Sequence, residues 1–179
     1  MARVLVLYAT TEGHTARIAE RIGQLLREAG HRVEARRAQS AAENVDVAPY
    51  DGVIVGASIH YGRHPGFLRA LLRGRSADLA ARAGAFFSVS LSAGGPGAKP
   101  AAAQRYLQTF LRQVGWRPKM TATFAGALQY SKYRAFKRAL MILFAGLAGG
   151  DTDTSRDYEY TDWDAVRRFA EAFAQALER

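Results

Sequence analysis

The chain has 179 residues, of which 49% are hydrophobic and 23% are charged, as expected for a folded domain with a sizeable core. It contains no cysteine, which excludes disulfides, thiolate metal sites and thiol redox chemistry, so any electrons that it handles need a bound cofactor. The net charge of +9 predicts anionic partners, such as nucleic acid, an anionic membrane surface or an acidic substrate. The four histidines lack a metal-ligand spacing, so no metal is expected.

Apolar runs alternate with helical patterns along the chain, which is typical of a doubly wound α/β fold with a parallel sheet. Strands are expected over five segments: 3–8, 31–36, 51–56, 83–91 and 120–127. The second is the most polar, so it is expected toward an edge of the sheet. Helices are expected over four segments: 15–29, 67–72 with a start near Pro65, 101–114, and from Thr161 onward. The last begins with Thr161-Asp162-Trp163-Asp164, which resembles a capping box, and the glycine-rich segment 92–97 is expected to be irregular.

The organisation of the chain indicates one domain over residues 1–179, because no repeat, low-complexity segment or second domain is visible. A core strand follows Met1 almost at once, so no signal peptide is expected, and no apolar run of sufficient length predicts a membrane-spanning helix. Between the fifth strand and the last helix lie 34 residues, about 128–161, where a few would suffice. An excess of this size indicates a functional insert.

The insert contains a predicted amphipathic helix over 132–148 that is basic in its first half, and no acidic residue occurs from Leu128 through Gly150. Such a helix suits an anionic membrane surface, where cations meet lipid head groups and the apolar face enters the acyl boundary. An ordinary core helix, a dimer contact and a cover for a ligand are the alternatives. The residues of the insert that could contact substrate or membrane are Tyr130, Lys132, Arg134, Lys137 and Arg138.

Three strand ends carry loops that suit a ligand, and ligands of parallel sheets bind at the carboxyl ends of the strands. The first loop follows strand one and opens a helix, so that hydroxyls, backbone N–H groups and the helix dipole converge as in a phosphate site. Small residues in the other two let the backbone approach a flat ring, against which Tyr61 could lie. The candidate cofactor-binding residues are Thr10, Thr11, Glu12, Gly13, His14 and Thr15, then Ala57, Ser58, Ile59, His60, Tyr61 and Gly62, then Ser88, Val89, Ser90, Leu91 and Ser92.

The type of phosphate loop limits which cofactors could bind. No G-x-x-x-x-G-K-[ST] occurs, which excludes a P-loop NTPase, and no G-x-G-x-x-G follows strand one, which argues against a dinucleotide site. A short hydroxyl-bearing loop suits a terminal monophosphate better than a pyrophosphate. Flavin mononucleotide (FMN) meets this requirement.

The segment Thr10-Thr11-Glu12-Gly13-His14-Thr15 resembles the flavodoxin phosphate loop, [ST]-x-T-G-x-T. Glu12 departs from that pattern, and because a carboxylate would repel a phosphate, its side chain is expected to point to solvent. With an acidic residue at this position, the loop resembles that of one flavodoxin-like branch, the menaquinone-dependent protoporphyrinogen IX dehydrogenases. Further segments carry the same resemblance along nearly the whole chain: 56–62, 87–91, 125–130, 149–154 and 160–163.

The resemblance implies a flavodoxin-like sheet of order 2-1-3-4-5 with a helical insert after strand five. It also implies FMN-dependent oxidation of protoporphyrinogen IX to protoporphyrin IX in haem biosynthesis, with the electrons passed to a membrane quinone. The expected location is cytoplasmic, peripheral on the inner face of the cell membrane. No catalytic acid or base stands out; His60, Tyr61, Tyr130 and Arg134 are candidates for substrate contact. The oligomeric state is left open.

Three other functions compete with this one. An electron-transfer flavodoxin is disfavoured because a carrier that docks to basic partners would be acidic, and because the basic insert would have no task. A flavodoxin-like NAD(P)H:quinone reductase is a second alternative, although nothing reads as a nicotinamide site. A nucleic-acid binder is suggested by charge alone, and no recognised binding motif supports it, so no nucleic acid is expected.

Overall fold

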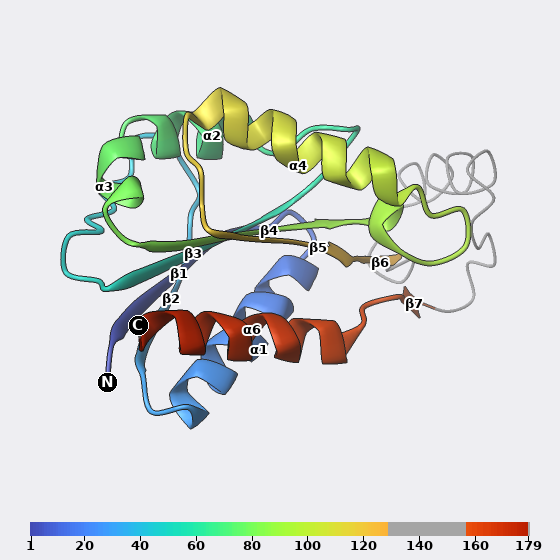
Figure 1. Ribbon diagram of the computed structural model, residues 1–179. Helices are drawn as coiled ribbons and strands as arrows, with labels where there is room; N and C mark the ends of the chain where they lie inside the picture. Colours follow the sequence, from blue (N-terminus) through green and yellow to red (C-terminus); the bar gives the residue numbers. More distant parts are fainter. Residues whose placement is uncertain (129–156, 179) are drawn as a thin grey trace.

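Five parallel strands form one twisted sheet in the order β2-β1-β3-β4-β5, as the flavodoxin resemblance implies (Figure 1). The computed structural model describes residues 1–128 and 157–178. The strands of the sheet are β1 (Arg3–Ala9), β2 (Arg32–Arg37), β3 (Gly52–Ser58), β4 (Ala83–Ser90) and β5 (Met120–Ala125). The polar strand β2 lies at an edge, as its composition predicts, and β1, β3 and β4 are buried on both faces.

Helices cover both faces of the sheet (Figure 1). They are α1 (His14–Glu28), α2 (Gly66–Arg73), α3 (Ser76–Ala80), α4 (Pro100–Val114) and α6 (Trp163–Leu177), and η1 (Leu91–Ala93) is a single 3-10 turn. Alternation along β1 divides the core: Val4 and Val6 pack with α1 and α6, whereas Leu5 and Leu7 pack with α2 and α4. None of the helices in the described ranges combines the length and the hydropathy that a membrane-spanning helix needs.

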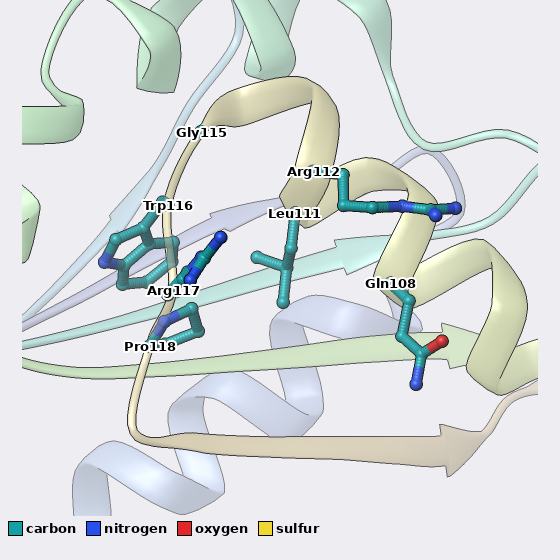
Figure 2. A pocket seen from close by; sticks show the side chains of 7 residues that line it. All are labelled: Gln108, Leu111, Arg112, Gly115, Trp116, Arg117 and Pro118. Carbon is teal, nitrogen blue, oxygen red and sulfur yellow. The ribbon is translucent and has the colours of Figure 1, made fainter.

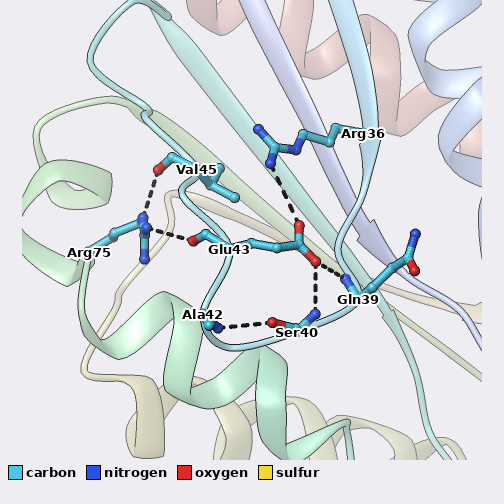
Figure 3. A network of polar contacts seen from close by, with 7 residues as sticks. All are labelled: Arg36, Gln39, Ser40, Ala42, Glu43, Val45 and Arg75. Carbon is cyan, nitrogen blue, oxygen red and sulfur yellow. Dashed lines mark hydrogen bonds and ion pairs between the residues drawn. The ribbon is translucent and has the colours of Figure 1, made fainter.

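The long connection from β2 to β3 is held by polar contacts of Glu43 and Arg75 rather than by secondary structure (Figure 3). Glu43 accepts hydrogen bonds from the backbone N–H groups of Gln39 and Ser40, at 2.5 and 2.8 Å. Arg75 donates to the carbonyls of Glu43 and Val45 at 2.9 and 2.6 Å. These bonds satisfy backbone groups that no strand or helix serves, and they keep this loop on the α2 side of the sheet.

The structure corrects four local predictions. Strand five ends at Ala125, and after Gly126 the chain forms β6 (Ala127–Leu128), which pairs antiparallel with β7 (Tyr158–Glu159). Helix α3 was not predicted, because five residues are too few for a periodic signal, and η1 makes part of the segment 92–97 regular. The N-cap of α6 is Asp162, whose Oδ1 accepts from the N–H of Ala165 at 2.9 Å, rather than Thr161. The predicted helix 132–148 lies outside the described residues.

Candidate cofactor site

The three predicted loops meet at the carboxyl edge of the sheet, because the strands that carry them are neighbours. In the parallel register, Ala9 of β1 lies beside Ala57 of β3, and Ser58 lies beside Val89 of β4. The N–H of Ile59 donates to the carbonyl of Val89 at 2.8 Å, which fixes the second loop to the third. The structure therefore brings together segments 10–15, 58–62 and 88–92.

The first loop is a tight turn that presents the amino end of α1. Thr10 Oγ1 accepts from the N–H of Gly13 at 2.9 Å, and Gly13, the N-cap, has φ of +91°, which glycine adopts without strain. Thr11 is exposed and Glu12 is half-buried. The first N–H groups of a helix have no carbonyl in a preceding turn to bond, and the dipole makes that end positive. This turn can bind an anion.

His14 and Thr15 are buried at the start of α1, and the His14 side chain turns toward α6. Its Nε2 lies 2.6 Å from Thr161 Oγ1, and the Thr161 hydroxyl donates to the carbonyl of Ala125 at 2.9 Å. Sequence reasoning missed Thr161, which stands 147 residues from His14 and has no local signal beyond its place before a helix.

A second link joins α1 to β7. Arg17 forms an ion pair with Glu159 at 2.7 Å, and Trp163 Nε1 donates to the other oxygen of the same carboxylate at 2.7 Å. The Arg17 guanidinium also lies over the Trp163 ring, 5.7 Å from its centre. Partial burial raises the pKa of Glu159, but the hydrogen bonds from Arg17 and Trp163 outweigh that effect and hold the pKa below its usual value.

The second loop closes as a small turn in which His60 and Arg63 exchange backbone hydrogen bonds of 2.9 and 3.1 Å. At its tip, Tyr61 has φ of +49° and is 74% exposed, unusual for a large aromatic side chain. Gly62 follows with φ of +75°. A bound ring system would find the Tyr61 ring accessible at the rim of this edge.

The hydroxyls at the ends of β3 and β4 fall into two kinds. Ser88 is buried, and its Oγ lies 2.8 Å from Nε2 of His64, a residue that sequence reasoning did not select. Ser58 Oγ and Ser90 Oγ are also buried, but neither has a hydrogen-bond partner among the described residues. A buried hydroxyl without a partner is costly, so these two groups suit an added polar ligand.

His64 is held neutral by its surroundings. Its ring lies 4.7 Å from that of Phe110 and 5.6 Å from that of Phe86, measured between centres. Burial lowers the pKa of His64 from 6.5 to about 4, because the charged form would lose its solvation. At neutral pH this histidine therefore braces Ser88 as an uncharged side chain.

The glycines that follow the third loop let neighbouring parts of the chain approach it closely. An added Cβ at Gly95 would lie 2.8 Å from the ring of Tyr160, and one at Gly94 would lie 2.8 Å from the Cβ of Ala125. The N–H of Gly126 donates to the carbonyl of Ser90 at 3.1 Å, and the carbonyl of Gly126 accepts from the N–H of Tyr160 at 3.2 Å. The glycines therefore let β7 and the start of α6 return against the end of β4.

The remaining predicted residues are placed as follows. Ala57 and Val89 lie in the core, and Leu91 and Ser92 are half-buried in η1. Tyr130, Lys132, Arg134, Lys137 and Arg138 lie outside the described residues. Within residues 1–128 and 157–178, no group of histidines and acidic residues could hold a metal ion.

A cleft of about 530 Å³ lies at the opposite, amino edge of the sheet, where α4 leads into β5 (Figure 2). Leu111 and Pro118 line it together with the arginines Arg112 and Arg117. Arg112 and Arg117 are exposed, and none of the predicted cofactor residues lines this cleft. This cleft therefore lies away from the edge of the sheet where the predicted cofactor residues converge.

A 2-1-3-4-5 sheet with a tight turn that leads from its first strand into a helix is the arrangement of a flavodoxin domain, and the model of the Flavodoxin domain family matches residues 5–155. A flavoprotein from Lactobacillus acidophilus, solved in complex with FMN, superposes with a TM-score of 0.53 at 15% identity, over 69% of this chain and 93% of that one. Two curated relatives extend the likeness over nearly the whole chain.

Both relatives are named protoporphyrinogen IX dehydrogenase (quinone). The Leishmania major protein is 38% identical over 96% of this chain and 74% of its own length. The Escherichia coli K12 protein is 32% identical over 99% of this chain and 97% of its own length. The chain belongs to the protoporphyrinogen IX dehydrogenase (quinone) family within the flavodoxin-domain proteins.

Proposed function

We propose that this protein oxidises protoporphyrinogen IX to protoporphyrin IX with bound FMN and passes the electrons to a quinone. The observation that carries the proposal is the likeness over 99% of the chain to a protoporphyrinogen IX dehydrogenase (quinone). The anion-binding turn at His14 and the strand-end hydroxyls supply the matching chemistry. The reaction removes six electrons and six protons from the substrate, so three quinones are reduced to quinols for each porphyrin formed.

FMN fits the residues at the carboxyl edge. The turn after β1 would hold the phosphate with the N–H groups at the start of α1, and Gly13 lets the backbone approach it. The buried hydroxyls of Ser58 and Ser90 would each gain from FMN a hydrogen-bond partner that the described residues do not provide. When bound, FMN supplies the acceptor for two electrons at a time, which the cysteine-free protein cannot supply itself.

The proposed roles of the other site residues follow from the placement of His60 and Tyr61 and from the basic sequence of the insert. Tyr61, exposed at the rim, would lie against a ring system, and His60 beside it would contact the substrate. Arg134 and its basic neighbours in the insert would meet the propionates of the substrate, since guanidinium and carboxylate groups pair well. The insert would also meet an anionic membrane surface, and the protein would then lie peripherally on the inner face of the cell membrane, beside its quinone.

The test is anaerobic turnover of protoporphyrinogen IX by the FMN-loaded protein with a quinone, followed by porphyrin fluorescence. The expected result is quinone-dependent porphyrin formation at three quinones per porphyrin. Parallel reactions with NADH or NADPH in place of the porphyrinogen test the quinone-reductase alternative. Quinone reduction by nicotinamide without porphyrin formation would overturn the proposal.

A further inference from the structure

The first turn of α1 receives its support from outside the helix. Its N-cap is Gly13, which has no side chain, and no acidic residue lies in the first turn. Helix α6, in contrast, carries its own cap in Asp162. A helix start without a side-chain cap is free to fray unless another element holds it.

Thr161 is the residue that holds the start of α1. Its hydroxyl has one hydrogen, and the carbonyl of Ala125 can only accept, so that hydrogen is used in the 2.9 Å bond to Ala125. The 2.6 Å contact with His14 must then run the other way, with His14 Nε2–H donating to Thr161 Oγ1. The chain His14–Thr161–Ala125 therefore fixes the tautomer and the direction of the histidine, and it joins α1 to the end of β5.

The linkage acts on the part of the site that would bind phosphate. His14 is the first residue of α1, and it is only 6% exposed, so its ring cannot swing into solvent without loss of packing. The Arg17–Glu159 ion pair and the Arg17–Trp163 contact hold the next turn of α1 against the same segment. The backbone N–H groups of the first turn are thereby directed by residues that come near the end of the chain.

We propose that His14 and Thr161 are positioning residues for the cofactor phosphate, which set the preference of the site for FMN over its dephosphorylated form, riboflavin. The inference rests on the proposed FMN site and adds a specificity determinant to it. Thr161 touches the helix that holds the phosphate, whereas the ring of the flavin would lie at the second and third loops. Loosening the pair therefore weakens the grip on phosphate and spares the grip on the ring.

The experiment is titration of the apoprotein with FMN and with riboflavin, followed by flavin fluorescence. T161V keeps the shape of the side chain and removes the hydroxyl, and T161S is the matched control, because it keeps both hydrogen bonds. Since one buried hydrogen bond contributes about 1 kcal/mol, T161V should raise the Kd for FMN about fivefold. The Kd for riboflavin should change less than about twofold, because riboflavin has no phosphate to lose contact with. T161S should bind both flavins like the wild type, because it keeps the hydroxyl.

H14F provides a second route from the other side of the pair. It should lower the FMN-to-riboflavin preference as T161V does, and the double variant should lose little more than the worse single one, because each single variant already removes the His14–Thr161 bond. In the wild type, FMN should slow amide exchange at Tyr160 and Ala165 more than riboflavin does. An unchanged preference in both single variants, or an equal loss of both flavins, would overturn the inference while leaving the proposed function intact. A wild-type protein that binds neither flavin would overturn both this inference and the proposed function.

Discussion

The two edges of the sheet differ in how their polar groups are satisfied. The amino edge holds the cleft of about 530 Å³, yet it is lined by exposed arginines that water can solvate and by apolar side chains. The carboxyl edge holds two buried hydroxyls that have no hydrogen-bond partner within residues 1–128 and 157–178, an exposed tyrosine and the uncapped start of α1. A site is marked better by polar groups whose partners are missing than by the volume of a hollow.

The carboxyl edge repeats this contrast on a smaller scale. Ser88 and Ser90 lie two residues apart on β4, and both are buried, but among the residues that the structure describes only the Ser88 hydroxyl has a hydrogen-bond partner, His64. Ser88 therefore belongs to the scaffold of the edge, whereas Ser90 faces the ligand in our account. The predictions below test this division.

The largest expected effect concerns the scaffold. Because the pKa of His64 is lowered from 6.5 to about 4, the unfolded state binds a proton that the folded state does not between these two pH values. The free energy of unfolding should therefore fall by about 3 kcal/mol as the pH drops from 6.5 to 4, and hold steady above 6.5 as far as this residue is concerned. Urea unfolding of the wild type and H64Q across that range measures it. Identical pH profiles for the two proteins would show that His64 is not held neutral.

The next effect compares one glycine from each edge. Gly13 at the start of α1 and Gly115 after α4 have φ of +91° and +77°, and an added Cβ would meet nothing within 4 Å at either. Alanine at each position should cost about 1 kcal/mol of unfolding free energy through the backbone alone. Only Gly13→Ala should also weaken FMN binding, as measured by flavin fluorescence. A loss of FMN affinity in both variants would mean that the backbone strain spreads across the domain.

The smallest stability effects belong to the strand-end hydroxyls. Ser58→Ala and Ser90→Ala remove hydroxyls that have no partner in the described part of the chain, so the unfolding free energy of the apoprotein should change by less than about 1 kcal/mol while FMN binds several times more weakly. Ser88→Ala should show the opposite pattern, with about 1 kcal/mol of lost stability and unchanged FMN affinity. Calorimetric unfolding and FMN titration of the three variants separate the two kinds of serine. FMN affinity that falls only in Ser88→Ala would reverse our assignment.

The sequence predicts the sheet well, because its strands are short apolar runs between helices of clear period. The polarity of 31–36 was enough to place β2 at an edge. The loops after β1, β3 and β4 could be placed at one edge, since parallel strands that neighbour one another end together. The flavodoxin resemblance supplied the strand order, which local patterns do not contain.

The long-range contacts of the site could not be predicted from the sequence. Thr161 reads locally as a helix cap, but its hydroxyl joins His14 to Ala125, and Asp162 takes the cap instead. His64 and Ser88 are 24 residues apart and meet only because β3 and β4 are adjacent. The β6–β7 pair involves two residues on each side, too short a run for any periodic signal. Which serine has a partner is likewise a property of the packed edge.

Calorimetric titration of the wild-type apoprotein with FMN and with riboflavin measures whether the carboxyl edge binds FMN through its phosphate. We expect one FMN per chain and a Kd for riboflavin at least about tenfold higher, because hydrogen bonds to a charged phosphate each contribute about 1.5–3 kcal/mol. Equal affinity for the two flavins, or no binding of FMN, would contradict it.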